Sequence, residues 1–228
     1  MNWFEPVRAY CERTDAGFWA EPVNALSNAA FLLSAAAAAR RAAQSQPPDR
    51  IGLGLAGSIA VIGIGSFLFH TLAVRWAMLA DVIPIAVFIY AYLALALWRF
   101  LRLSRVRVVA GTAGFALFGF SLTPMLDDIT GLDLSQLTNG SIDYLPALLA
   151  LFGVTAMTLG RPEERFIGTG RRLTGIGALF VISLAARSAD QAACAVLPIG
   201  THALWHVLNA IALYALVATA IRHRAVAG

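Results

Sequence analysis

The sequence predicts an all-α membrane protein, a bundle of seven transmembrane helices. The first observation is composition: of 228 residues, 59% are hydrophobic and 13% are charged, and the mean hydropathy is +0.71. A soluble domain carries about 25% charged residues. The second observation is that the apolar residues gather in runs of roughly 20, the length that crosses a bilayer as a helix. These runs lack the alternation of a membrane β-barrel.

Each apolar run is bounded by loops rich in proline, glycine or arginine. The predicted spans are 24–43, 51–72, 78–100, 107–125, 143–160, 172–189 and 201–221, of which the fifth and sixth are the shortest. Residues 1–23 then form an extracytoplasmic N-terminal segment, 24–221 the helical domain and 222–228 a cytoplasmic tail. The acidic loop that contains Asp127, Asp128 and Asp133 is expected to be solvated.

The arginines predict the orientation. All 17 basic residues are arginines, and most of them lie in loops that share one face of the predicted bundle. The other face holds Arg8, Arg13, Arg75 and Arg187. Basic loops stay in the cytoplasm, so we expect the N-terminus outside and the C-terminus inside. This distribution argues against nucleic-acid binding, and the Ala- and Arg-rich composition favours a bacterial inner membrane.

Three histidines fall at one predicted depth, near the outer face. His202 and His206 are four residues apart and share a helix face, and His70 lies near the outer end of the second span. Three imidazoles with a fourth position open to water are the ligands of a catalytic zinc site. The alternative is that these side chains make interhelical hydrogen bonds. His223, in the basic tail, is expected to be solvated.

Two further polar residues lie at the same depth. Ser66 precedes His70 by one helical turn, and Asp81 follows a short outer loop. A serine there can donate a hydrogen bond to a developing oxyanion, and a carboxylate can accept the proton of a zinc-bound water. The alternatives are a serine bonded to its own helix backbone and a carboxylate at a helix N-terminus.

The motifs GSFLFH, LADVIP and HALWH, with the N-terminal CERTDAGFWAEPVNALSN, resemble the alkaline ceramidase family. That family belongs to a superfamily of seven-helix membrane hydrolases that includes the adiponectin receptors. The resemblance runs from about Cys11 to about Asn209. It implies that His70, His202 and His206 bind zinc and that Ser66 and Asp81 complete the active site. The implied reaction hydrolyses the amide of a ceramide-like membrane lipid to a sphingoid base and a fatty acid.

The resemblance also implies a calcium site in the N-terminal segment. Glu12 and Glu21 match two of its acidic ligands, whereas Ala9 and Thr14 stand where the family has ligands. Asp15 is the residue that can compensate, because calcium needs six to eight oxygen ligands. The alternative is a solvated acidic loop without an ion. A second departure is Val82, which replaces a secondary carboxylate beside Asp81.

Cys11 and Cys194 both fall on the predicted outer side, where a disulfide is stable. We expect the two to be bonded; the alternative is two separate buried thiols. Two other functions stay open: a hydrolase of another lipid amide or ester, and a non-enzymatic metal-binding receptor or transporter. A receptor or transporter has no need of an oxyanion donor beside an acid, so Ser66 and Asp81 favour an enzyme.

Overall fold

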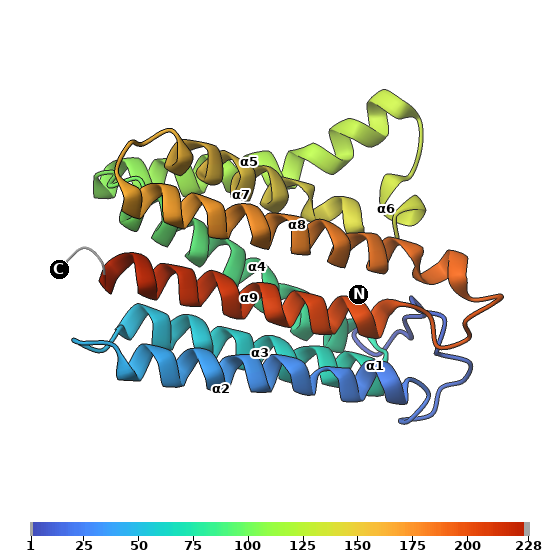
Figure 1. The fold of residues 1–228 in the computed structure, drawn as a ribbon. Helices are drawn as coiled ribbons and strands as arrows, with labels where there is room; N and C mark the ends of the chain where they lie inside the picture. Colours follow the sequence, from blue (N-terminus) through green and yellow to red (C-terminus); the bar gives the residue numbers. More distant parts are fainter. Residues whose placement is uncertain (1, 226–228) are drawn as a thin grey trace.

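Helices carry almost all of the described chain, residues 2–225 of the computed structural model (Figure 1). In chain order they are α1 (Pro22–Ser27), α2 (Ala29–Gln44), α3 (Arg50–Leu72), α4 (Arg75–Arg99), α5 (Arg105–Thr130), α6 (Leu134–Leu137), the 3-10 helix η1 (Ser141–Tyr144), α7 (Leu145–Leu159), α8 (Glu164–Ala193) and α9 (His202–Ala225). No strand forms among residues 2–225, where Pro6 and Val74 make an isolated bridge.

Within residues 2–225, seven helical segments are long and apolar enough to cross a membrane, and the predicted fold class is confirmed. They are Pro22–Gln44, Arg50–Leu72, Arg75–Arg99, Arg105–Thr130, Ser141–Leu159, Glu164–Ala193 and His202–Arg224. One predicted length is wrong, because the sixth helix, expected among the shortest, has 30 residues. Its first turns carry arginines such as Arg165, Arg171 and Arg172. Long basic side chains can extend from a helix end to the aqueous boundary, so the helix continues beyond its apolar run.

Helix α9 lies at the centre of the bundle. It packs against α8 and α2 and also contacts α3, and Figure 1 shows it between α3 and α8. Trp205 and Val217 on α9 are fully buried. Helix α5 lies at the periphery, where Leu122 and Thr123 are its buried residues and Phe120 is exposed. An exposed apolar surface of this kind is what a helix presents to lipid.

Helices α3 and α4 touch directly near the end that holds the N-terminal segment. A Cβ atom on Gly65 would collide with the carbonyl oxygen of Ala80, and only glycine permits this approach. The chain reverses between the two helices at Ala73, which adopts a left-handed conformation. The contact places the neighbouring residues Ser66 and Asp81 on facing helices at one level of the bundle.

The opposite end of the bundle is closed by an ion pair. Asp49 caps the N-terminus of α3 by accepting from the Gly52 amide, and Arg99 donates to both of its oxygens, at 2.6 and 3.2 Å. Arg224 lies 3.5 Å away on α9. Burial alone would raise the pKa of Asp49, but the Arg99 hydrogen bonds, the Gly52 amide and the two positive charges hold it below its usual value.

The expectation for His223 is wrong. This side chain is buried between Phe100 and Phe166, and its Nδ1 atom pairs with the Thr169 hydroxyl at 2.8 Å. Helix α9 continues to Ala225, so the first part of the predicted tail, 222–228, is helical and turns His223 inward. Residues 226–228 of that tail lie outside the described residues.

The acidic stretch predicted as a loop is partly helical, because α5 continues to Thr130 and includes Asp127 and Asp128. Its carboxylates bond neighbouring backbone amides. Asp133 caps α6 by accepting from the Gln136 amide, and Asp127 accepts from the Leu134 amide. Asp128 is exposed. These local bonds explain the acids without an ion.

Candidate metal centre

Three buried histidines converge at the end of the bundle near the N-terminal segment. The ligand nitrogens of His70, His202 and His206 all lie within 4.8 Å of one another, and each side chain is fully buried. His70 comes from the last turn of α3, and the other two from the first turns of α9. Helix α9 returns antiparallel to α3, so residues separated by more than 130 positions meet.

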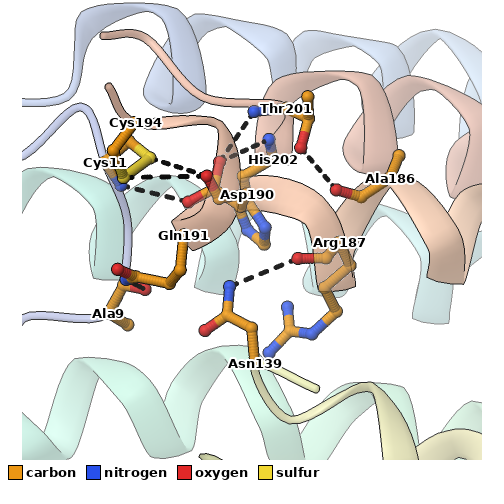
Figure 2. Close-up of a disulfide and its surroundings, with 10 residues drawn as sticks. All are labelled: Ala9, Cys11, Asn139, Ala186, Arg187, Asp190, Gln191, Cys194, Thr201 and His202. Carbon is orange, nitrogen blue, oxygen red and sulfur yellow. Dashed lines mark hydrogen bonds between the residues drawn. A yellow bond between two sulfur atoms is a disulfide. The ribbon is translucent and has the colours of Figure 1, made fainter. Parts of the chain in front are cut away.

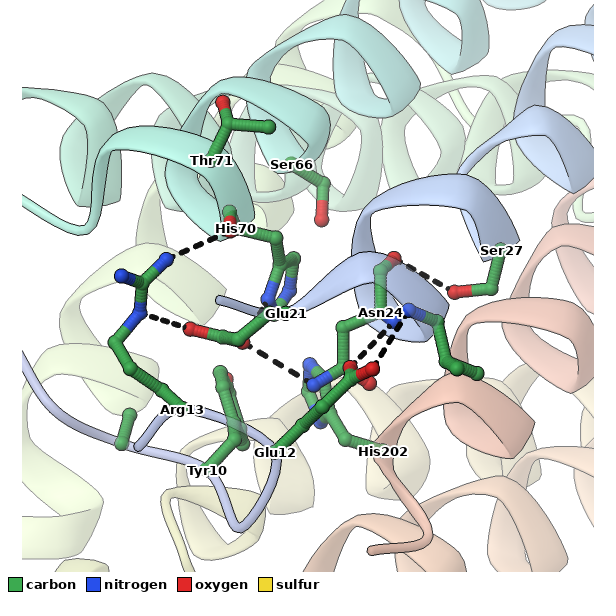
Figure 3. A network of polar contacts seen from close by, with 12 residues as sticks. Tyr10, Glu12, Arg13, Glu21, Asn24, Ser27, Ser66, His70, Thr71 and His202 are labelled. Atoms are coloured by element: carbon green, nitrogen blue, oxygen red, sulfur yellow. Dashed lines mark hydrogen bonds and ion pairs between the residues drawn. The ribbon is translucent and has the colours of Figure 1, made fainter. Parts of the chain in front are cut away.

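Two of the imidazoles are oriented by hydrogen bonds at Nδ1. His70 Nδ1 lies 2.6 Å from a Glu21 carboxylate oxygen (Figure 3), and His206 Nδ1 lies 2.7 Å from the Ser27 hydroxyl. The Ser27 hydroxyl donates its own proton to the Asn24 carbonyl. Both Nδ1 atoms must therefore carry the proton, which leaves a lone pair on each Nε2. This is the arrangement that partners of metal-bound histidines impose.

His202 is held by stacking. Its ring lies between Tyr10, with centroids 3.5 Å apart, and Trp205, with centroids 5.0 Å apart. Both of its ring nitrogens lack a hydrogen-bond partner, as does Nε2 of His70. Buried polar atoms are nearly always paired, so unpartnered nitrogens that converge at one point indicate a missing ligand. The donor set fits a zinc ion, for which three imidazoles and an open position are suited.

Ser66 and Asp81 border the three histidines. The Ser66 hydroxyl lies 3.3 Å from His206 Nε2, and Asp81 is buried with one carboxylate oxygen unpartnered. The contact at Gly65 described above brings these two residues to the same level. The structure therefore assembles the five residues that the sequence singled out for the zinc centre.

Asp190 fixes the start of α9, and sequence reasoning did not identify it. One of its oxygens accepts from the Thr201 and His202 amides at 2.7 and 3.0 Å, and the other accepts from the Cys11 amide at 3.0 Å (Figure 2). It therefore acts as the cap of the helix that carries two of the histidines. Gly200 passes so close to this carboxylate that a Cβ atom would collide with it.

Cys11 and Cys194 form a disulfide beside Asp190, with their Cα atoms 5.3 Å apart (Figure 2). The bond ties the N-terminal segment to the end of α8. It spans 183 positions in the sequence. The segment that contributes Tyr10 and Glu21 is thereby anchored next to the centre that these residues contact.

The acidic residues expected to bind calcium do not offer a free ligand set. Both carboxylate oxygens of Glu12 accept from backbone amides at the start of α1, those of Val23 and Asn24, at 2.7 and 2.8 Å (Figure 3). Asp15 accepts from the Gly17 amide. Both oxygens of Glu12 and one oxygen of Asp15 are therefore already bonded to protein amides. The residues present do not fit the predicted calcium ion.

Glu21 is saturated as well. It accepts from Arg13 on one oxygen and from His70 and Asn24 on the other. Burial alone would raise the pKa of Glu21, but the hydrogen bonds from His70, Arg13 and Asn24 hold it below its usual value. The carboxylate is therefore kept in the form that accepts from His70 Nδ1.

An apolar cavity of about 90 Å³ lies inside the bundle, close to the centre. Ile62, Ile85 and Asn209 on its wall lie one helical turn beyond the site residues of α3, α4 and α9. Arg187, whose guanidinium donates to the Tyr10 hydroxyl at 3.0 Å and lies over the Trp205 ring, lines an adjoining cavity. Burial raises the pKa of the Tyr10 hydroxyl, so Arg187 faces a neutral phenol.

Converging imidazoles, a serine and an acid, one helical turn from the wall of an apolar cavity, are suited to metal-assisted hydrolysis of a lipid. The class of protein that the fold and the site define is thus a membrane-embedded hydrolase. The family model described as Ceramidase matches residues 9–227, and the chain belongs to that family. Membership implies an amide hydrolase that acts on ceramide in a membrane. No curated protein matches the chain significantly.

Proposed function

We propose that this protein is a zinc-dependent amidase of ceramide-like N-acyl sphingoid lipids that releases a sphingoid base and a free fatty acid. The observation that carries the proposal is the convergence of three buried imidazoles. Nε2 of His70 and both ring nitrogens of His202 have no partner among the described residues, and Nε2 of His206 contacts only the Ser66 hydroxyl, at 3.3 Å. His70, His202 and His206 would hold the ion. When bound, zinc supplies a Lewis acid for the amide carbonyl and lowers the pKa of a coordinated water to about 7.

The chain's own residues perform the proton transfers. Asp81 accepts a proton from the attacking water and returns it to the leaving nitrogen, which departs as the amine of the sphingoid base. Ser66 donates a hydrogen bond to the carbonyl oxygen as negative charge develops on it. Both side chains are buried, and a donor and an acid held in a dry site need no rearrangement during the reaction.

The cavity offers a place for the lipid chain. Its wall is almost entirely apolar, with Asn209 as an exception near the centre. An acyl chain that enters this space leaves the scissile amide at the end where Ser66 and Asp81 lie. The chain comes from a bilayer that is equally apolar, so its burial adds packing rather than hydrophobic energy, and polar contacts at the amide would set the affinity.

We also propose that the centre faces the periplasm of a bacterial inner membrane. The disulfide lies at the same end as the histidines, and disulfides persist in oxidising compartments. The opposite end carries the basic residues near Asp49. A C-terminal alkaline phosphatase fusion should be inactive and a C-terminal fluorescent fusion bright. The reverse pattern would place the centre on the cytoplasmic side.

A lipid panel tests the proposed reaction. The full chain, purified in detergent, is incubated with ceramide, an N-acyl amino-acid lipid and a glycerolipid ester, and released fatty acid is quantified. We expect release from ceramide, loss of release with 1,10-phenanthroline and recovery on adding Zn²⁺. Arg8→Ala, on the exposed N-terminal segment, is the control that should behave as the unchanged protein.

Each other outcome contradicts a stated part of the proposal. Release that persists after zinc has been removed, as verified by elemental analysis, would exclude the metal. Preferential release from another amide or from the ester would redirect the substrate assignment. No release from any lipid by a zinc-loaded, folded protein would favour a receptor or transporter.

A further inference from the structure

Arg13 is a buried cation whose side chain has no role in the proposed reaction. Its guanidinium donates to one carboxylate and three backbone carbonyls, and its side chain is only 3% exposed. Figure 3 shows the bonds to Glu21 and to the His70 carbonyl. Nε bonds Glu21, Nη1 bonds the carbonyls of Asp15 and Gly17 at 3.2 and 3.4 Å, and Nη2 bonds the carbonyl of His70 at 2.8 Å. These oxygens come from the N-terminal loop, the start of α1 and the end of α3.

The partners of Arg13 have the chemistry of a calcium ligand set. A carboxylate and several carbonyl oxygens around one positive charge are what Ca²⁺ selects. Here the five N–H donors of a guanidinium satisfy them instead. The other acids of the segment have protein partners of their own. Both oxygens of Glu12 accept from backbone amides, one oxygen of Asp15 accepts from the Gly17 amide, and Glu5 pairs with Arg75.

Arg13 also connects to the histidine centre by two routes. Arg13 bonds the Glu21 carboxylate, which in turn bonds His70 Nδ1. Its Nη2 atom also donates directly to the His70 backbone carbonyl. The imidazole and the main chain of this histidine are thus both fixed by groups that Arg13 holds in place. If Arg13 were absent, the buried Glu21 carboxylate would lose its strongest donor, and its bond to His70 would lose its alignment.

We propose that Arg13 is a built-in cation that replaces a divalent ion in the N-terminal segment and positions His70 through Glu21. The stability of the protein is accordingly independent of calcium, whereas the family resemblance implied a calcium site in this segment. The positioning role rests on the proposed metal centre, whereas the independence from calcium does not. Arg13 is a positioning residue and touches no substrate.

The first experiment measures calcium binding without activity. The thermal unfolding midpoint of the zinc-loaded full chain in detergent is compared in EGTA and in millimolar Ca²⁺. The unchanged protein should show the same midpoint in both. In Arg13→Gln, which leaves the carboxylate and carbonyls without their cation, Ca²⁺ should raise the midpoint. Arg8→Ala removes one positive charge from the exposed part of the same segment and should show no calcium response.

The second experiment measures zinc affinity by competition with a chromophoric chelator. Loss of a group that orients a metal ligand weakens binding by about 10- to 100-fold. We expect a loss of this size in Arg13→Gln, a smaller loss in Arg13→Lys, and none in Arg8→Ala. Partial recovery of zinc affinity in Arg13→Gln on adding Ca²⁺ would show that the two cations are interchangeable.

Two results would overturn the inference. A calcium-dependent midpoint in the unchanged protein would show that Arg13 leaves room for an ion. Wild-type zinc affinity in folded Arg13→Gln would show that Arg13 does not position His70. Neither readout uses lipid turnover, so they stay informative even if ceramide-like lipids prove not to be the substrate. If Arg13→Gln fails to fold, the first comparison on the unchanged protein still tests the inference.

Discussion

The two ends of the bundle each bury histidine and carboxylate side chains, but these side chains have different hydrogen-bond and ion-pair partners at the two ends. At one end His70, His202 and His206 converge beside Asp81, and three nitrogens of His70 and His202 have no partner there among the described residues. At the other, Asp49 pairs with arginines, and the single imidazole of His223 bonds a threonine through Nδ1, packs between aromatic rings and leaves one isolated nitrogen, Nε2, unpartnered.

This difference shows which buried polar groups indicate function. The far end consists of charge pairs and single hydrogen bonds, which hold helix ends together at the cost of desolvation. The histidine end leaves several potential ligand atoms unpartnered at one point, an arrangement that folding alone does not favour. Convergence of unpartnered atoms, rather than burial itself, therefore distinguishes the centre.

The sharpest test of the comparison is to remove one histidine from each end. His206→Ala should lose stoichiometric zinc and reduce the rate by at least about 10³-fold, because a metal centre with two ligands loses the ion on which the chemistry depends. His223→Ala should keep both zinc and activity. Elemental analysis and fatty-acid release are measured on protein of equal helicity. Equal zinc loss in the two variants would abolish the distinction between the ends.

The second-largest effect is expected for Asp81→Asn. This substitution keeps the shape of the side chain but removes its ability to take a proton, and the rate should fall about 10²- to 10⁴-fold. Zinc content should be unchanged, which separates proton transfer from metal binding. Asp128→Asn, on the exposed last turn of α5, is the matched control and should retain full activity. An active Asp81→Asn would assign the proton transfers to another group.

The sequence alone predicts which histidines come together, because each one depends on helix position. Spacing put His202 and His206 on one face, and topology put His70 and Asp81 at their depth. His223 was misjudged because Arg222 and Arg224 flank it, yet helix geometry directs neighbouring residues to different faces.

The supporting residues could not be predicted in the same way. Ser27 meets His206 across 179 positions, and Asp190 meets Cys11 across the same separation. Such pairs depend on how an irregular N-terminal segment folds over the helix ends, and no periodicity encodes it. A buried acid near the end of an apolar span, such as Asp190, is the only local signal that the sequence offered.

A moderate effect is expected for Ser27→Ala. The hydroxyl accepts from His206 Nδ1, and its loss should weaken zinc binding by about 10- to 100-fold while leaving the fold intact. Ser45→Ala, which removes a hydroxyl bonded to the Ala42 carbonyl at the opposite end, is the matched control and should bind zinc normally. Chelator competition measures both. Equal affinities in the two variants would mean that the Ser27 contact does not orient the imidazole.

The smallest effect on the centre is expected for Asp49→Asn, which should alter stability and leave zinc affinity unchanged. Breaking a buried ion pair destabilises a fold by roughly 3 kcal/mol, and the neutral side chain would leave Arg99 without its counter-charge. The folded state lowers the pKa of Asp49, so its contribution is complete above the ordinary value of about 3.9 and is lost as the pH falls through the folded value. The stability difference between the unchanged protein and Asp49→Asn should therefore be constant near neutral pH and shrink below about pH 4. A difference that stayed constant down to pH 3 would show that the charge of Asp49 is not what holds this end together.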